Sequence, residues 1–483
     1  MNRSLFAIAL LLAGCAVGPD YAPPAAPRQT DYDLARLPPA ERVAASGPLL
    51  EQTDAVPADW WRNFNCPALD DSETMALAGN NTLVAAKATL RQAQQAVLGT
   101  ASAYWPQVDL GGGVQRNGSG AFTPAGGGTS SNFFSVGPSV SYLADLFGAT
   151  QRAVEQSQAQ ADYQRAQLAA AALTVTGGVA SEAIAIAGAR LQIASLEAIL
   201  AGDQQNLALV TRQFEIGKAA RSDVLTAQSQ LVGDQSQLAS LRQLLSVARH
   251  ALAVLESRAP SDWTPPDFVI ADFTVPARLP SLLPSSLVHQ RPDILAAEAT
   301  LKADSAAIGV AVAQYYPSVT LSAAVTQQSI NLGQLFEGVN NLWSVGASFT
   351  TPLFHGGALD AQKQAAVEAY QAQLAIYEQT VMVAFGQVAD SLRALEHDAE
   401  QVHASQDARD ISAQSLDLQR SSYKVGKTSL LQLLTAQRAF AQASQNLASA
   451  QTQQLQDVVT FFLAVGGSDT PALSPLRSPP ASS

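Results

Sequence analysis

The sequence contains one unit of about 200 residues twice, and this duplication constrains the fold more than any other feature. Residues 80–108 align with residues 291–319 at an offset of 211, and Ala-Thr-Leu recurs in both stretches. Further along, FEIGKAARSDVLTAQ from Phe214 aligns with YKVGKTSLLQLLTAQ from Tyr423 at an offset of 209. Each copy must therefore supply the same elements in the same order, and a Pro-rich linker at residues 259–284 joins the copies.

Each copy begins with an Ala-rich stretch that predicts a helix, followed by two short alternating segments. The helices cover residues 74–103 and 294–314, and Pro106 and Pro317 end them because proline cannot continue a helix. The alternating segments lie at about 107–117, 132–143, 318–328 and 342–353. Each has about ten residues of period two, which is the length and pattern of a membrane-spanning β-strand. Four such segments at matched positions favour two membrane-spanning hairpins over amphipathic hairpins in water.

The longest predicted element in each copy is a helix without proline, at residues 149–213 and 358–422. Apolar residues recur there every seven positions, which indicates supercoiled helices packed side by side. The first row consists of Val179, Ile186, Ile193, Leu200, Leu207 and Phe214. The second row consists of Leu374, Val381, Val388, Leu395, Val402, Arg409, Leu416 and Tyr423, of which only Arg409 is not apolar. A helix of about 65 residues is about 100 Å long, so we expect this element to project from any compact domain.

A tight turn and a return helix complete each copy. Gly217 and Gly426 follow the long helices, and a glycine just past a helix is its usual left-handed stop. The return helices are expected at residues 221–256 and 428–465. The fold class is thus mainly α-helical with a transmembrane β part. Four strands cannot close a barrel and lipid does not tolerate open sheet edges, so we expect an oligomer larger than a dimer.

The N-terminus has the pattern of an export signal that ends in a lipoprotein processing site. Arg3 precedes a short apolar run and LAGC ends at Cys15, so residues 1–14 are the expected signal peptide and Cys15 is the expected acylated residue. No later stretch offers about 18 continuous apolar residues, so we expect no membrane-spanning helix. The remaining expected parts are an extended lipid-anchored segment at 15–58, repeat 1 at 59–258, repeat 2 at 285–466 and a flexible tail at 467–483.

Composition and polar motifs argue against nucleic-acid binding and against catalysis. The net charge is −12 with 28 Lys and Arg residues, which does not suit a nucleic-acid partner. The five His residues form no i, i+4 zinc pair, and no G-x-S-x-G occurs. VGKTSLL, which contains Gly426 and Lys427, resembles the end of a phosphate-binding loop, but Ser421 stands at the first glycine of that motif and no strand precedes it. We therefore expect no enzyme activity, no metal and no cofactor.

Three motifs carry a resemblance to a known family, namely CAVGPDY from Cys15, DWWRNF from Asp59 and HQRPDILAAEATL from His289. Together with the paired Gly-Lys turns, they resemble the TolC family of bacterial outer-membrane channels, and more closely its lipoprotein branch of OprM- and NodT-like efflux components. The resemblance implies a homotrimer with a twelve-stranded β-barrel in the outer membrane and a long periplasmic α-helical coiled-coil barrel. It also implies two partners, a periplasmic adaptor protein and an inner-membrane pump of the proton-driven resistance-nodulation-division type.

The same resemblance places the gate and the adaptor-docking site at the two tip turns. Tyr423 matches a tip tyrosine that helps to hold the closed state, and Phe214 is its counterpart in the first copy. The docking turns consist of Gly217, Lys218, Gly426 and Lys427. In each turn the glycine reverses the chain, and the lysine is expected to meet solvent or an adaptor.

Other tip residues depart from the family pattern or have two interpretations. Thr428 stands where members often carry Arg, and Gln432 and Thr435 stand where some carry Asp, which departs from the family's Arg-based gate link and acidic constriction. Asp223 either caps the first return helix or contributes a weaker acidic ring at the gate. The RPDI motif from Arg291 is interpreted as a helix start with a structural role.

These features favour an outer-membrane exit channel of a tripartite efflux system, which passes drugs or small molecules outward from the pump and adaptor. One alternative within the same class is the outer-membrane duct of a type I protein-secretion system. An alternative of another class is a lipid-anchored periplasmic scaffold of helical hairpins, which would have no β-barrel and no heat-modifiable trimer.

Overall fold

The computed structural model describes residues 16–25, 49–52, 56–118, 130–281, 284–338 and 341–466. The expected signal peptide, Cys15 and the C-terminal tail lie outside the described residues. The chain divides into two compact units. The strand unit comprises Met1–Pro24, Thr89–Arg165 and Ala296–Glu378, and the helical unit comprises Ala25–Ala88, Ala166–Leu295 and Gln379–Ser483. Because of the duplication, each unit takes material from both copies.

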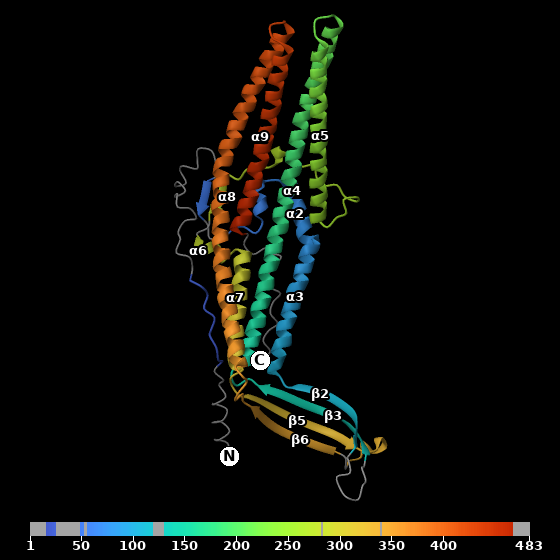
Figure 1. The fold of residues 1–483 in the computed structure, drawn as a ribbon, viewed down its shortest axis with the longest axis vertical. Coiled ribbons are helices and arrows are strands. Elements are labelled where there is room, and N and C mark those ends of the chain that lie inside the picture. The colour runs from blue at the N-terminus through green and yellow to red at the C-terminus, as the bar shows by residue number, and fades with distance from the viewer. Residues whose placement is uncertain are drawn as a thin grey trace. The chain divides into compact units, whose positions relative to one another are not determined.

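Four antiparallel strands form one sheet in the strand unit (Figure 1). The strands are β2 (Gln107–Gly118), β3 (Ser130–Ala144), β5 (Ser318–Ser329) and β6 (Asn341–Thr350), paired in the order β2-β3-β5-β6. The two copies meet at β3 and β5, where Val140 lies opposite Ala323. Among the described strands, β2 and β6 each have one neighbour, so both outer edges of the sheet are open. Apolar side chains on these edge strands, such as Val108 and Phe349, are exposed.

The prediction of one continuous helix at residues 74–103 is wrong in one respect, because two helices meet at Asn80. Helix α2 spans Pro67–Gly79 and α3 spans Asn81–Ala101, with a short 3-10 turn, η3, at Ser102–Tyr104. Asn80 has extended backbone, and its Oδ1 accepts a 2.8 Å hydrogen bond from the Thr82 N–H. Its Nδ2 donates a 2.7 Å hydrogen bond to the Leu255 carbonyl. Asn80 therefore caps a new helix and fixes α2 against the end of the first return helix. The corresponding helix in copy 2 is α7 (Pro292–Ala313), preceded by the short α6 (Pro284–Leu287).

The two long helices are α4 (Ala149–Glu215) and α8 (Ala358–Lys424), and the return helices are α5 (Arg221–Leu255) and α9 (Leu430–Val465). The predicted heptad rows point inward along much of their length. Buried members of these rows are Val179, Ile186, Leu200, Val381, Val388, Leu395 and Leu416. Near the tip of α4 the row is less buried, since the last residue of its row, Phe214, is 39% exposed.

Helix α4 contains an 18-residue window with a mean hydropathy of 1.5, so it passes the length and composition test for a membrane span. The sequence expectation concerned continuous apolar residues, whereas a mean hydropathy tolerates the isolated polar residues of α4. Half of that window is buried inside the protein, and α4 buries Val179 and Ile186 completely. The apolar character of α4 is therefore explained by helix packing.

The linker between the copies is more ordered than its proline content indicates. Strand β4 (Arg278–Ser281) pairs in parallel with β1 (Leu49–Gln52), and a 3-10 turn, η4, spans Ile270–Asp272. The sequence did not predict this two-stranded sheet, because its strands are short and lie far apart in the chain. A further 3-10 turn, η5, at Leu332–Gln334 lies between β5 and β6.

Two of the three family motifs have structural roles in the helical unit. In DWWRNF, which forms the 3-10 helix η2 (Trp60–Phe64), the Trp60 ring stacks on Phe462 of α9 with centroids 5.1 Å apart. In RPDI, the buried Arg291 guanidinium donates to the Ala464 carbonyl at 2.6 Å and to Gln387 Oε1 at 2.7 Å. These contacts support the structural interpretation of RPDI, because Arg291 joins α7, α8 and α9.

Candidate functional site

The turn between α4 and α5 is a Schellman motif built on Gly217. Gly217 has φ +70°, and its N–H donates to the Phe214 carbonyl at 2.9 Å. The Lys218 N–H donates to the Gln213 carbonyl at 2.7 Å. This pair of hydrogen bonds closes a helix through a left-handed residue, a conformation that glycine adopts without the steric cost of a Cβ atom.

The turn between α8 and α9 repeats this geometry at matched positions. Gly426 has φ +75°, and its N–H donates to the Tyr423 carbonyl at 3.0 Å. The Lys427 N–H donates to the Ser422 carbonyl at 2.9 Å. The Gly-Lys pair in each copy is thus explained by the end of a helix. The Gly-Lys of VGKTSLL therefore does not need to be explained by nucleotide binding. Phe214 and Tyr423 occupy the same place in the two motifs.

Each return helix starts with a side chain that reaches back to the turn. In α5, Asp223 Oδ2 accepts a 3.0 Å hydrogen bond from the Ala220 N–H. In α9, Ser429 Oγ accepts from the Gln432 N–H at 3.3 Å, and Gln432 Oε1 accepts from the Ser429 N–H at 3.2 Å. Because Ser429 is this N-cap, α9 begins at Leu430 and not at Thr428 as predicted. Of the two interpretations of Asp223, the helix-capping contact is present in the structure.

One hydrogen bond joins the two hairpins directly at their tips. The Tyr423 hydroxyl, at the end of α8, donates to Gln213 Oε1, near the end of α4, at 2.6 Å. Burial raises the pKa of Tyr423, and the negative charge of Asp223 adds to this shift. The phenol therefore stays protonated and able to donate at neutral pH. Sequence analysis singled out Tyr423 and missed Gln213.

The polar residues at the start of α9 are engaged within their own hairpin. The Thr428 hydroxyl donates to Gln419 Oε1 at 3.0 Å. The Thr435 hydroxyl donates to the Leu431 carbonyl at 2.8 Å, one turn back in the same helix. Neither hydroxyl forms a hydrogen bond with the opposite hairpin. Among the described residues, the side-chain hydrogen bond that joins the last turns of α4 and α8 is the one between Tyr423 and Gln213.

Another link between the hairpins lies below the tips, where buried side chains join α4 to α9. Gln437 of α9 accepts a hydrogen bond from Asn206 Nδ2 and donates one to Asp203 Oδ1, and the three side chains are at most 9% exposed. Burial, and then the hydrogen bond and charge of Asp234, raise the pKa of Asp203 to about 7. Sequence analysis missed this cluster. The signal in the sequence that could have revealed it is that Asp203, Asn206 and Gln437 are polar residues on helix faces that pack against other helices.

The outer surfaces of both turns combine exposed apolar and basic side chains. Ile216 and Val425, which directly precede the two turn glycines, are 66% and 68% exposed. Lys218 and Lys427, which directly follow them, are exposed. Within the described residues there is no group of three His, Cys, Asp or Glu side chains placed to hold a metal ion. The turns therefore offer contact surfaces next to the Tyr423–Gln213 link between the hairpins.

Comparison with known proteins gives consistent matches over the length of the chain. The family described as "Outer membrane efflux protein" matches residues 74–255 and 283–467. Nodulation protein T of Rhizobium leguminosarum bv. viciae is 28% identical over 466 residues, covering 95% of this chain and 92% of that protein. The toluene efflux pump outer membrane protein TtgF of Pseudomonas putida is 30% identical over 477 residues, covering 95% of each chain.

A solved structure agrees with these sequence matches. The outer-membrane channel OprN is 26% identical, and its fold matches with a TM-score of 0.85 over 95% of this chain and 100% of that chain. These findings confirm the resemblance to bacterial outer-membrane channels and the predicted fold of the chain. The chain belongs to the outer membrane efflux protein family and is an outer-membrane efflux channel with a helical periplasmic part.

Proposed function

We propose that three copies of the chain assemble one exit duct, in which each copy contributes four strands to a twelve-stranded barrel. The observation that carries this proposal is the strand unit, a four-stranded antiparallel sheet with both outer edges open. In lipid, unpaired backbone groups at such edges cost several kcal/mol each, so β2 of one copy would pair with β6 of the next. Exposed apolar side chains on these strands suit contact with acyl chains.

The two hairpins of each copy would then form the wall and the periplasmic tip of the duct. Tyr423 would hold the closed state through Gln213, and separation of the hairpins would break this bond. The exposed surfaces around Gly217, Lys218, Gly426 and Lys427 would dock the periplasmic adaptor. Asp223, whose charge acts on Tyr423, would support the closed state indirectly.

The partners in this proposal are a periplasmic adaptor and an inner-membrane pump of the resistance-nodulation-division type. The pump would select the drugs or other small molecules, and the duct would pass them without chemical change. An acylated Cys15 would anchor each copy in outer-membrane lipid. The name of the relative TtgF, a toluene efflux pump component, favours efflux of small molecules over protein secretion.

The test is complementation of a deletion strain with the wild-type gene and with Cys15→Ala, followed by susceptibility to a panel of toxic compounds. We expect the wild type to lower susceptibility and the lipid-free variant to do so less well. A heat-modifiable trimer in outer-membrane fractions should accompany the activity. Susceptibility unchanged for every compound would contradict efflux, and a carbonate-extractable monomer would contradict the barrel.

A further inference from the structure

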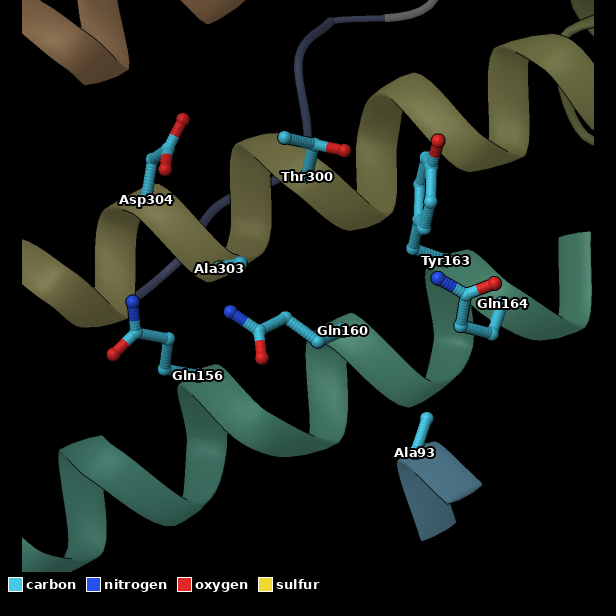
Figure 2. A pocket seen from close by; sticks show the side chains of 8 residues that line it. All are labelled: Ala93, Gln156, Gln160, Tyr163, Gln164, Thr300, Ala303 and Asp304. Carbon is cyan, nitrogen blue, oxygen red and sulfur yellow. The ribbon is translucent and has the colours of Figure 1, made fainter. Parts of the chain in front are cut away.

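A hollow lies between α3, α4 and α7, within the strand unit (Figure 2). Its volume is about 480 Å³, which falls in the range of about 300–1,000 Å³ typical of small-molecule sites. Two small residues, Ala93 of α3 and Ala303 of α7, leave this space open. The other lining residues are Gln156, Gln160, Tyr163, Gln164, Thr300 and Asp304.

Four polar residues that line the hollow have no side-chain partner among the described residues, whereas the Thr300 hydroxyl donates to the Ala296 carbonyl at 3.0 Å. Gln156, Gln160 and Gln164 are spaced by four residues and therefore lie on one face of α4. Figure 2 shows the side chains of Gln156 and Gln160 extending from α4 into the space beside α7. Within the described residues, neither these three amides nor the Tyr163 hydroxyl forms a side-chain hydrogen bond. Their donors and acceptors are available to a ligand.

Asp304 gives the hollow a negative charge, and in the part of the chain that the structure describes it forms no ion pair. Burial raises the pKa of this carboxyl. The nearest basic residue in sequence, Lys302, lies 3.8 Å from Asp162, and Arg165 also pairs with Asp162, at 2.7 Å. A half-buried carboxylate without a counter-ion is stabilised when a cation binds beside it.

We propose that this hollow is a binding subsite for organic cations of drug size that carry an ammonium or aromatic iminium group. Asp304 supplies the opposite charge, and the Tyr163 ring, which stands beside the hollow, supplies a face for a cation–π contact. The glutamine amides accept hydrogen bonds from N–H groups on the ligand. The polar lining gives little apolar burial, so the site binds weakly and releases quickly. This role rests on the proposed function: in an exit duct, the subsite would retain cationic substrates briefly during their passage.

The test is a fluorescence titration of the purified full-length protein in detergent with the cationic dye ethidium at pH 8. We expect saturable binding, weakened about tenfold or more by Asp304→Asn, because a charged partner is lost. Asp162→Asn is the matched control, since it makes the same change of charge at a carboxylate that is already paired, and it should change the Kd less than twofold. Ala93→Phe, which fills the hollow from a partly exposed position, should abolish binding.

Two results would overturn the proposal, and both are independent of transport. Equal weakening by Asp304→Asn and Asp162→Asn would show attraction to the net acidic charge alone, and binding unaffected by Ala93→Phe would place the dye elsewhere. Complementation with Asp304→Asn separates this proposal from the function itself. We expect it to restore resistance to uncharged compounds and to be deficient for cationic ones. If the wild type fails to complement the deletion strain, the proposed exit duct is contradicted, whereas the dye titration still tests the subsite.

Discussion

The Tyr423 hydroxyl lies 2.6 Å from Gln213 Oε1, and this hydrogen bond joins the last turn of α8 to the last turn of α4. Tyr423 and Gln213 belong to different copies of the repeat, so the bond links two hairpins that are otherwise equivalent. A neutral hydrogen bond contributes about 1 kcal/mol, which changes an equilibrium about fivefold. A link of this strength can hold a closed state and still break when a partner binds.

We expect Tyr423→Phe to shift each copy in the duct toward its open state by about fivefold, because the ring stays and only the donor is lost. Single-channel conductance in planar bilayers measures the open fraction. Gln213→Ala should have the same effect, and the double variant should add nothing further, since both changes remove one bond. Additive effects of the two substitutions would show that Tyr423 and Gln213 act separately.

Asp203 should make the connection between α4 and α9 depend on pH. Its pKa in the folded protein is raised to about 7, so the stability that it contributes is present below its unfolded pKa of about 3.9 and is lost as pH rises through about 7. Besides Gln437 and Asn206, the groups acting on it are Asp234, which raises the pKa, and Arg438, which lowers it.

We expect Asp203→Asn to raise the melting temperature by a few degrees at pH 8 and by clearly less at pH 5, because pH 5 lies only about one unit above the unfolded pKa. The reason is that Asn keeps polar contacts with Gln437 and cannot ionise. Asp417→Asn, at an exposed position on α8, is the control and should show no such difference. A benefit of Asp203→Asn that is equal at both pH values would rule out titration of this carboxyl as the cause.

Glu73 should be a source of instability in the helical unit. It is fully buried in α2, and neither carboxylate oxygen has a hydrogen-bond partner among the described residues. Burial, and then the charges of Asp70 and Glu256, raise its pKa well above the usual value, so stability falls as pH rises above about 4.3. We expect Glu73→Gln to raise the melting temperature at pH 8 more than at pH 5. An unchanged melting temperature at both values would mean that a partner satisfies Glu73.

Gly426 should tolerate alanine poorly although space is available. A Cβ there would meet no atom within 4 Å, but φ is +75°, a conformation that costs a non-glycine residue about 1–2 kcal/mol. Gly386, inside α8, also has open space around a Cβ, and helix propensity predicts a gain of up to about 1 kcal/mol for Gly386→Ala. Opposite shifts of the two variants in thermal unfolding would support this argument, and a stabilising Gly426→Ala would contradict it.

The turns show what the sequence could and could not predict. Gly217 and Gly426 were predictable as helix stops, because only local backbone geometry is involved and the repeat gives it twice. Gln213 was not predictable as the partner of Tyr423, since the pairing depends on how two helices about 210 residues apart align with each other. The same reason explains why the pairing of β3 with β5 and that of β1 with β4 were missed. Asn80 looked like one more residue in a helical stretch, because the Leu255 carbonyl, which accepts from its Nδ2 and fixes it against the first return helix, is also distant in sequence.

The segment after Cys15 occupies a socket in the strand unit. The buried Arg152 guanidinium donates to Asp20 Oδ1 at 2.7 Å and to the Val17 carbonyl at 3.2 Å. Gly18 has φ +94°, and a Cβ there would lie 2.5 Å from the Gly309 Cα atom. The socket therefore accepts glycine alone at position 18, and it fixes the segment from Val17 to Asp20 beside α4 and α7.

We expect Gly18→Ala to release this segment from the socket, because the new Cβ meets backbone that cannot move aside cheaply. The readout is labelling of a cysteine introduced by Ala16→Cys with a membrane-impermeant maleimide, which should be several-fold faster in the Gly18→Ala background and also in Arg152→Gln. Gly99→Ala, where a Cβ meets nothing within 4 Å, is the control and should leave labelling unchanged. Equal labelling rates in all four proteins would mean that the segment leaves the socket readily in the wild type.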